Sequence, residues 1–299
     1  MKTAIVDNPT VASSRPNFVS DLAELVKARL TLLVLVTTAV GYYLGVGNPI
    51  SYFGLFHVVF GTALAAASAA ALNQWWERRV DAVMHRTKTR PIPAGRMLPR
   101  DALLIGTLLA IAGIIYLAFA CNALTASLAA LTIVLYIFAY TPLKRISTTN
   151  TLIGAIPGAI PPMIGWAAAR GTLDAGAWSL FAILFFWQMP HFFALAWMYR
   201  EDYLRAGFRM MSSDDETGAR SSSQSVLFCM LLLIVGAVPA YLGVTNAIYV
   251  PIAFALGGLF IAVAMQFHRK RTARAARALF IASIVYLPLL LGALVLTKT

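Results

Sequence analysis

Nine apolar stretches, each long enough to cross a lipid bilayer, follow one another along this chain. They lie at about residues 28–46, 51–73, 102–120, 123–141, 151–169, 177–198, 226–244, 248–267 and 278–296. A helix needs about 20 apolar residues to cross the hydrocarbon core, and in lipid only helices or closed barrels satisfy the backbone hydrogen bonds. Because these runs are continuous and do not alternate, they exclude a barrel. The sequence therefore predicts an all-α, polytopic membrane bundle of about nine transmembrane helices.

The composition supports a single membrane domain. Hydrophobic residues make up 60% of the 299 residues and charged residues 12%, whereas a soluble domain carries about 25% charged residues. We expect one transmembrane domain over residues 27–299, preceded by a polar tail over residues 1–26. The tail carries Asp7, Asp21 and Glu24, and it resembles neither a signal peptide nor an Arg-rich transit peptide. The expected location is a bacterial cytoplasmic (inner) membrane.

The basic residues predict how the chain is oriented. The net charge is +12, which would also suit a nucleic-acid-binding protein. If the N-terminus is cytoplasmic, however, every Lys and Arg lies in a cytoplasmic segment except Arg170 and Lys298. The positive-inside rule explains this segregation without nucleic acid as a partner. In the same topology Cys121 and Cys229 fall near opposite faces of the bilayer, too far apart for a disulfide.

Three polar residues at the end of the second apolar stretch have helical spacing. Asn73, Glu77 and Asp81 lie at i, i+4 and i+8, so they share one face of a helix. Carboxylates at a membrane boundary are costly unless they are paired or bound to metal. Magnesium takes oxygen ligands, commonly a few carboxylates together with substrate phosphates. The pattern fits a magnesium site or a solvated helix end balanced by neighbouring arginines.

A dense cationic turn follows these residues and contains Arg86 and Arg90. Guanidinium groups match phosphate oxygens in bidentate geometry. Further charged side chains lie in the other cytoplasmic loops, namely Lys144, Arg145, Glu201 and Asp202. All these loops converge on one mouth in the predicted topology. We therefore expect a site for a magnesium-bound diphosphate near the cytoplasmic face.

The fifth and sixth stretches carry prolines beside residues of possible function. In the fifth, Pro157 and Pro161 predict a kinked or broken helix, either for packing or beside a cavity. In the sixth, His191 follows Pro190, and it lies about 16 Å deeper in the bilayer than Asp202. This histidine could bind a substrate group, ligate iron, or hydrogen-bond to a backbone carbonyl freed by Pro190.

Residues 73–95 resemble the first aspartate-rich motif of the UbiA superfamily of intramembrane prenyltransferases. Glu77 and the run from Arg86 to Pro91 resemble the branch of that superfamily that farnesylates heme. Segments 140–145, 150–166 and 187–210 and the run that begins at Lys27 are similar too, so the resemblance covers about residues 25–290. Tyr199 and Tyr203 depart from the pattern, because many members carry aspartates there.

This resemblance implies an enzyme that transfers a farnesyl group from farnesyl diphosphate to a vinyl group of heme b, adds a hydroxyl from water, and releases heme O and diphosphate. It implies Mg²⁺ as cofactor. The candidate catalytic and metal-binding residues are Asn73, Glu77, Asp81 and Asp202. The candidates for binding diphosphate are Arg86, Arg90, Lys144 and Arg145. The candidates for binding heme or the prenyl chain are His191, Trp187, Tyr199 and Tyr203.

Two alternatives stay open at the level of sequence. One is a UbiA-type prenyltransferase with an aromatic or quinone-precursor acceptor, against which Glu77 and the segment around His191 argue. The other is a membrane transporter, whose ion site would lie at the membrane midplane, whereas the acids here lie at helix ends. The expected partners are farnesyl diphosphate, heme b and the lipid bilayer, with heme A synthase or terminal-oxidase assembly proteins as candidate protein partners.

Overall fold

The computed structural model describes residues 17–47 and 49–299, and within these ranges the chain is helical with no strand. Residues 1–16 of the predicted polar tail, which include Lys2, Asp7 and Arg15, lie outside the described residues. The rest of that tail folds as a short helix, α1 (Phe18–Leu25), whose first turn is capped by the side chain of Asn17.

Nine helical spans are long and apolar enough to cross a membrane in the described part of the chain, which confirms the predicted fold class. They are α2 (Ala28–Gly45), α3 (Tyr52–Asp81), α4 (Pro99–Ala120), α5 to α6 (Ala123–Leu143), α7 with α8 (Asn150–Arg170), α9 (Ala175–Met198), α11 with α12 (Ala219–Tyr241), α13 (Tyr249–Lys270) and α14 (Ala273–Leu296). The short elements α10 (Arg200–Arg205) and η2 (Met211–Ser213) follow α9.

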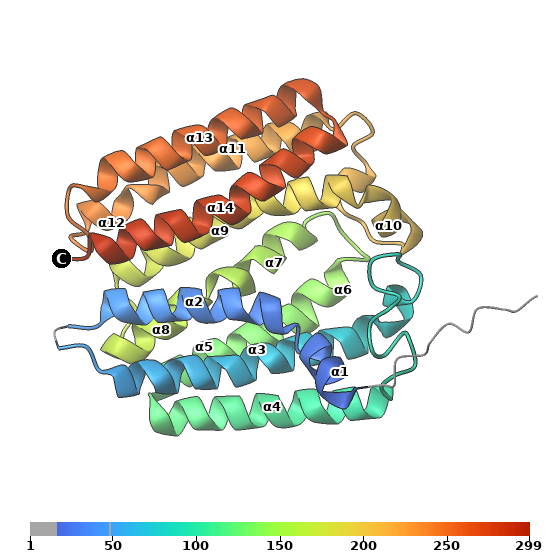
Figure 1. Cartoon of the computed structure of the whole chain (residues 1–299), viewed down its shortest axis with the longest axis horizontal. Helices are drawn as coiled ribbons and strands as arrows, with labels where there is room; N and C mark the ends of the chain where they lie inside the picture. The colour runs from blue at the N-terminus through green and yellow to red at the C-terminus, as the bar shows by residue number, and fades with distance from the viewer. Residues whose placement is uncertain (1–16, 48) are drawn as a thin grey trace, which may run out of the picture.

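The spans lie roughly side by side along the long axis of the molecule (Figure 1). The end that carries α1, α10 and the loop over residues 82–98 is here called the polar end. The C-terminus lies at the opposite end, here called the far end (Figure 1). Large apolar side chains such as Phe119 and Ile234 are exposed on the outside of the bundle, as expected for surfaces that face lipid.

Two spans are interrupted within their length. Between α5 (Ala123–Val134) and α6 (Thr141–Leu143) the helix widens into a π-helical turn, η1 (Leu135–Tyr140). The fifth span breaks at Ile160, between α7 (Asn150–Ala159) and α8 (Pro161–Arg170). The predicted break at the prolines is therefore confirmed, whereas Pro190 lies inside a continuous α9.

Close packing explains two of the glycines in these spans. α2 packs against α8, and a Cβ atom on Gly41 would collide with the backbone of Pro162, while one on Gly165 would collide with the backbone of Thr38. Small residues let membrane helices approach closely without a large apolar driving force. This contact fixes α2, which forms one wall of the site described below.

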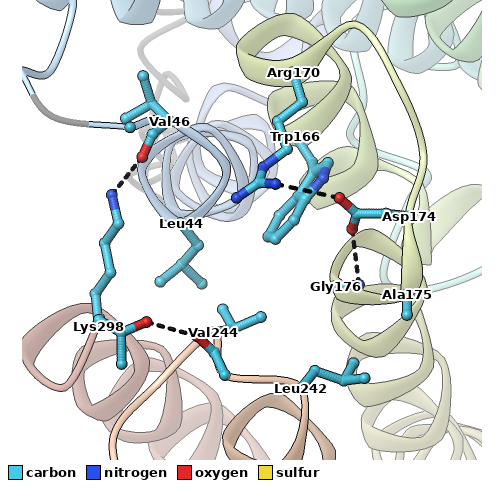
Figure 2. Close-up of a pocket in the computed structure, with 13 residues that line it drawn as sticks. Leu44, Val46, Trp166, Arg170, Asp174, Ala175, Gly176, Leu242, Val244 and Lys298 are labelled. Carbon is cyan, nitrogen blue, oxygen red and sulfur yellow. Dashed lines mark hydrogen bonds and ion pairs between the residues drawn. The ribbon is translucent and has the colours of Figure 1, made fainter.

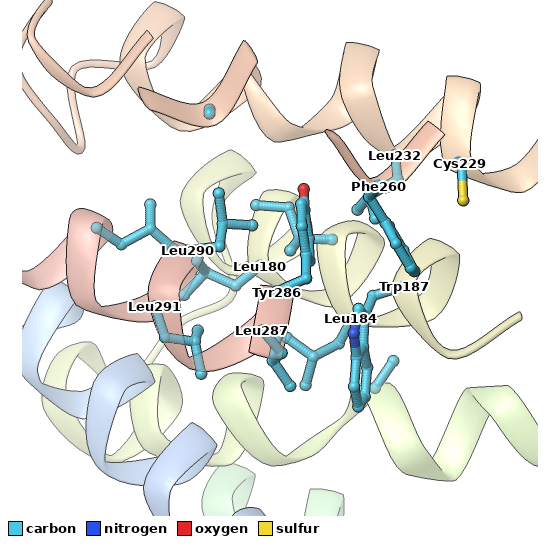
Figure 3. Close-up of a cluster of buried hydrophobic side chains, with 14 of the residues drawn as sticks. Leu180, Leu184, Trp187, Cys229, Leu232, Phe260, Tyr286, Leu287, Leu290 and Leu291 are labelled. Carbon is cyan, nitrogen blue, oxygen red and sulfur yellow. The ribbon is translucent and has the colours of Figure 1, made fainter. Parts of the chain in front are cut away.

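The second half of the chain has its own apolar core, formed by α9, α11 (Ala219–Gly236), α13 and α14 (Figure 3). Phe260 and Tyr286 stack there with ring centroids 4.9 Å apart. Both cysteines are free, as predicted. Cys229, however, does not lie near a bilayer face. The helix α11 begins at Ala219, earlier than expected, so Cys229 lies within that core.

Candidate active site

The helix α3 continues past the apolar stretch to Asp81, so the three polar residues do share one helical face. The side chains of Asn73, Glu77 and Asp81 are all buried at the polar end of the bundle. Burying two carboxylates one turn apart is unfavourable unless each has a partner. The surrounding segments supply those partners.

Each of the three residues accepts a hydrogen bond from one cation, and each cation comes from a different segment. Lys27 Nζ lies 3.0 Å from Asn73 Oδ1. Lys144 Nζ lies 2.8 Å from Glu77 Oε1. The guanidinium of Arg90 lies 2.6 Å from Asp81 Oδ2. The three pairs form a ladder of acceptors and cations one helical turn apart.

One oxygen of this ladder stays without a partner. Asp81 Oδ1 is buried and accepts no hydrogen bond within residues 17–47 and 49–299. An unsatisfied buried carboxylate oxygen is costly, and a divalent cation would satisfy it. No group of three or more His, Cys, Asp or Glu side chains gathers in this described part of the chain. The residues therefore fit Mg²⁺ held by few protein oxygens and completed by substrate phosphates.

Lys144 owes its position to the π-helical turn that precedes it. That turn places Tyr140 so that its ring lies 4.5 Å from Lys144 Nζ, and Phe208 contributes a second ring at 5.7 Å. Burial would lower the pKa of Lys144, but the neighbouring carboxylate of Glu77 raises that pKa above its usual value. Lys144 is therefore held as a cation in a buried place.

Lys27 is a half-buried cation that the sequence pattern did not assign to the site. It joins α1 to α2 with φ at +48°, a left-handed conformation that is uncommon for any residue except glycine. This turn directs the side chain inward to Asn73, and burial lowers the pKa of Lys27 below its usual value. In sequence the residue resembles the basic residues that flank many membrane spans, which concealed its role.

These side chains line a polar cleft of about 160 Å³ at the polar end. Its other lining residues include Arg86, Tyr136, Tyr140, Asn150, Phe192 and Tyr203. An apolar cavity of about 260 Å³ adjoins the cleft and shares Lys27, Leu30, Tyr136, Tyr140 and Phe192 with it. A compartment with a cationic mouth and an apolar interior suits a greasy substrate with an anionic head.

Asp202 does not line the polar cleft. Its two carboxylate oxygens accept weak hydrogen bonds from the backbone amides of His85 and Arg86, at 3.3 and 3.4 Å. Arg205 adds a third bond at 2.9 Å. The second acidic motif therefore holds the loop that carries Arg86, and the geometry gives Asp202 no contact with the metal candidates on α3.

Tyr199 and Tyr203 flank Arg86. The guanidinium carbon of Arg86 lies 5.3 Å from the ring of Tyr199 and 6.0 Å from that of Tyr203, and only Tyr203 of the two lines the polar cleft. Arg145, next to Lys144, is exposed and does not line it. Of the four predicted diphosphate ligands, the structure thus brings Arg86, Arg90 and Lys144 together and leaves Arg145 outside.

His191 and Trp187 both bind Ser283 on α14. His191 Nδ1 lies 2.7 Å from Ser283 Oγ, and Trp187 Nε1 donates to the Ser283 carbonyl at 2.8 Å. The imidazole stacks between Trp187 and Phe280, at 5.4 and 4.7 Å. Neither residue lines the polar cleft or the apolar cavity. The histidine is thus anchored by a serine and not by a carbonyl of its own helix.

A second cavity, of about 350 Å³, lies at the far end (Figure 2). Arg170 and Lys298, the two basic residues outside the predicted cytoplasmic segments, line this cavity. Lys298 Nζ donates to the carbonyls of Tyr43 and Val46, each at 2.7 Å, and Arg170 Nε donates to that of Gly45 at 2.8 Å. Both cations therefore satisfy the last carbonyls of α2, which explains their position without a ligand.

Comparison with known proteins agrees with this architecture. Residues 34–287 match the model of the UbiA prenyltransferase family. A protoheme IX farnesyltransferase of Solibacter usitatus is 43% identical to this chain over 93% of it and 98% of the relative.

Two solved structures share the fold at 15% identity. One, described as digeranylgeranylglyceryl phosphate synthase, has a TM-score of 0.78 and covers 93% of this chain and 98% of its own. The other is a UbiA homolog from Archaeoglobus fulgidus bound to GPP and Mg²⁺, with a TM-score of 0.65, covering 92% of this chain and 99% of its own.

Proposed function

This chain belongs to the UbiA prenyltransferase family, and from that premise we propose that its polar cleft transfers a farnesyl group from farnesyl diphosphate to a vinyl group of heme b. The observation that supports prenyl transfer is the set of three buried acceptors, each paired with a cation, at the mouth of an apolar cavity. The choice of heme b as acceptor is supported by the names of the relatives.

The diphosphate binds in the polar cleft. Arg86, Arg90 and Lys144 line it and donate to phosphate oxygens, and Lys27 adds a fourth cation. Asp81 and Glu77, with the amide oxygen of Asn73, would hold Mg²⁺, which neutralises the charge that develops on the leaving diphosphate. Asp202 keeps the loop of Arg86 in place through the backbone amides of His85 and Arg86.

The reaction proceeds at the boundary between the polar cleft and the apolar cavity. The allylic C–O bond breaks, and its electron pair leaves with the diphosphate, which the cations stabilise. The vinyl π electrons of heme b form the new C–C bond. Water then adds to the resulting cation, and its proton passes to solvent, giving the hydroxyl of heme O.

The farnesyl chain occupies the apolar cavity. Its walls are apolar or small residues of α2, α3, α7 and α9, such as Val34, Ala66, Ala70 and Pro157. Tyr136 and Tyr140 stand where this cavity meets the polar cleft. Their rings lie 5.5 Å apart, and aromatic faces stabilise a nearby cation.

The direct test is incubation of the purified protein with heme b, farnesyl diphosphate and Mg²⁺, read by mass spectrometry. We expect a product with the mass of heme b plus a farnesyl group and a hydroxyl, and release of diphosphate. A parallel incubation with an aromatic acid in place of heme b tests whether the enzyme is instead a prenyltransferase of aromatic acceptors. Prenylation of that acceptor and not of heme b would contradict the proposed function.

We propose that the polar end faces the cytoplasm of a bacterial cell, across its inner membrane. The segregation of Lys and Arg supports this orientation. Reporter fusions after Lys144 and after Thr245 should report opposite sides, with the first one cytoplasmic. The same side for both fusions would refute the topology.

We propose that His191 contributes to heme binding from outside the polar cleft and the apolar cavity, neither of which it lines. Because Ser283 engages Nδ1, the other ring nitrogen is available to a ligand. His191→Ala should weaken heme binding or change the heme absorption spectrum, with farnesyl diphosphate binding intact. If the variant instead lowers the amount of folded protein and leaves the spectrum of the remainder unchanged, His191 has only a packing role.

A further inference from the structure

The inner end of the apolar cavity carries one polar side chain that the proposed reaction does not use. The cavity follows α7 from the polar cleft, where Asn150 lies, past Gly154 to Gly158, a distance of about 12 Å at 1.5 Å per residue. Pro161, the first residue of α8, also lines it. On α9 it passes from Phe192 to Gln188, one turn deeper. Gly158 and Gln188 meet in this inner part of the cavity.

The amide of Gln188 is fixed in one orientation. Its Nε2 donates to two carbonyls, that of Ala155 at 3.2 Å and that of Leu184 at 3.0 Å. Both N–H bonds are therefore used, which identifies Oε1 as the atom directed at Gly158. The side chain is only 5% exposed, so two helices hold it rigidly.

Gly158 is needed for this arrangement. A Cβ atom at that position would collide with Oε1 of Gln188, so any larger residue would displace the amide. The hydroxyl groups of two threonines that also line the cavity are engaged by backbone carbonyls nearby in sequence. Thr31 donates to the Val26 carbonyl and Thr132 to that of Leu128. Gln188 thus presents a fixed polar surface among the mostly apolar residues of the cavity.

We propose that Gly158 and Gln188 form an end wall that sets the length of the prenyl chain that the enzyme accepts. This inference rests on the proposed function, because it assumes that the chain lies in the apolar cavity. The amide, held by two hydrogen bonds, narrows the path of an alkyl chain that reaches it. On this proposal the wall excludes by size a chain that is one isoprene unit longer than farnesyl.

The test is a competition among equimolar geranyl, farnesyl and geranylgeranyl diphosphates, with heme b as acceptor and products resolved by mass. Gln188→Ala removes the wall. It should raise the use of geranylgeranyl relative to farnesyl diphosphate at least about tenfold, since a pocket that excludes added methylenes by size discriminates by about that factor. Gln188→Leu keeps the volume of the side chain and should keep the wild-type ratio.

Gly158→Ala tests the wall from the opposite helix. By pushing the amide of Gln188 into the cavity, it should shift use toward geranyl diphosphate, and Gly158→Ala combined with Gln188→Ala should remove that shift. Gly292→Ala is the matched control, because a Cβ atom on Gly292 in α14 would contact nothing. Should Gln188→Ala fail to fold, Gln188→Asn, one methylene shorter, enlarges the cavity less and should shift the ratio in the same direction.

Different outcomes of this competition test the proposed function and the proposed end wall. If the wild type prenylates heme with none of the three diphosphates, the proposed function fails. If the wild type prefers farnesyl diphosphate and folded Gln188→Ala keeps that preference within about twofold, the end wall is refuted and the function stands. An equal shift in Gln188→Leu and Gln188→Ala would also refute a wall based on size.

Discussion

Asp81→Asn should lower turnover by about a hundred- to a thousandfold while the protein stays folded and inserted. Removing one preorganised electrostatic group from an active site costs about that factor in kcat. Asparagine preserves the shape of the side chain and one oxygen for Arg90, which lies 2.6 Å from Oδ2. It removes the negative charge and the second carboxylate oxygen, Oδ1, which has no partner in the described structure.

Diphosphate release measured across a magnesium titration checks this result. The half-saturating concentration of Mg²⁺ should rise for Asp81→Asn, and excess Mg²⁺ should not restore the wild-type rate. Glu201→Gln is the control, because Glu201 is an exposed carboxylate on the adjacent polar-end segment. Near-normal turnover of Asp81→Asn at limiting Mg²⁺ would show that Asp81 does not hold the metal.

The architecture could be predicted from the sequence because lipid allows so few solutions. Continuous apolar runs in a bilayer must be helices. The spacing of Asn73, Glu77 and Asp81 was enough to predict that their side chains share one helical face. The broken helix at Pro161 followed from the missing backbone N–H of proline. In each case a rule that involves only neighbouring residues was sufficient.

The partners within the site could not be predicted in the same way. Lys144 and Arg145 are adjacent and chemically alike in sequence, yet only Lys144 is buried against Glu77. The π-helical turn over Leu135–Tyr140 decides which of the two points inward, and apolar periodicity does not reveal such a turn. Asp202 likewise faces the backbone of another loop, a contact between segments that are distant in sequence.

The second large effect is expected at Lys144, which is buried, and not at its exposed neighbour Arg145. Lys144→Met leaves the carboxylate of Glu77 buried without its counter-ion, and breaking a buried pair in this way costs about 3–5 kcal/mol. We expect much less folded protein and no detectable prenyl transfer. Arg145→Met, one residue away and exposed, should change the amount of folded protein and the turnover less than about threefold, because exposed substitutions usually change stability by about 0.5 kcal/mol or less.

A double variant separates the role of Lys144 in folding from its role in binding diphosphate. Glu77→Gln combined with Lys144→Met removes both charges, so the thermal stability lost in Lys144→Met should largely return. Activity should not return, because the polar cleft has then lost a cation for the diphosphate and a carboxylate for the metal. The measurements are unfolding temperature in detergent and diphosphate release. If the double variant recovers both stability and turnover, Lys144 serves only to neutralise Glu77 and does not bind the diphosphate.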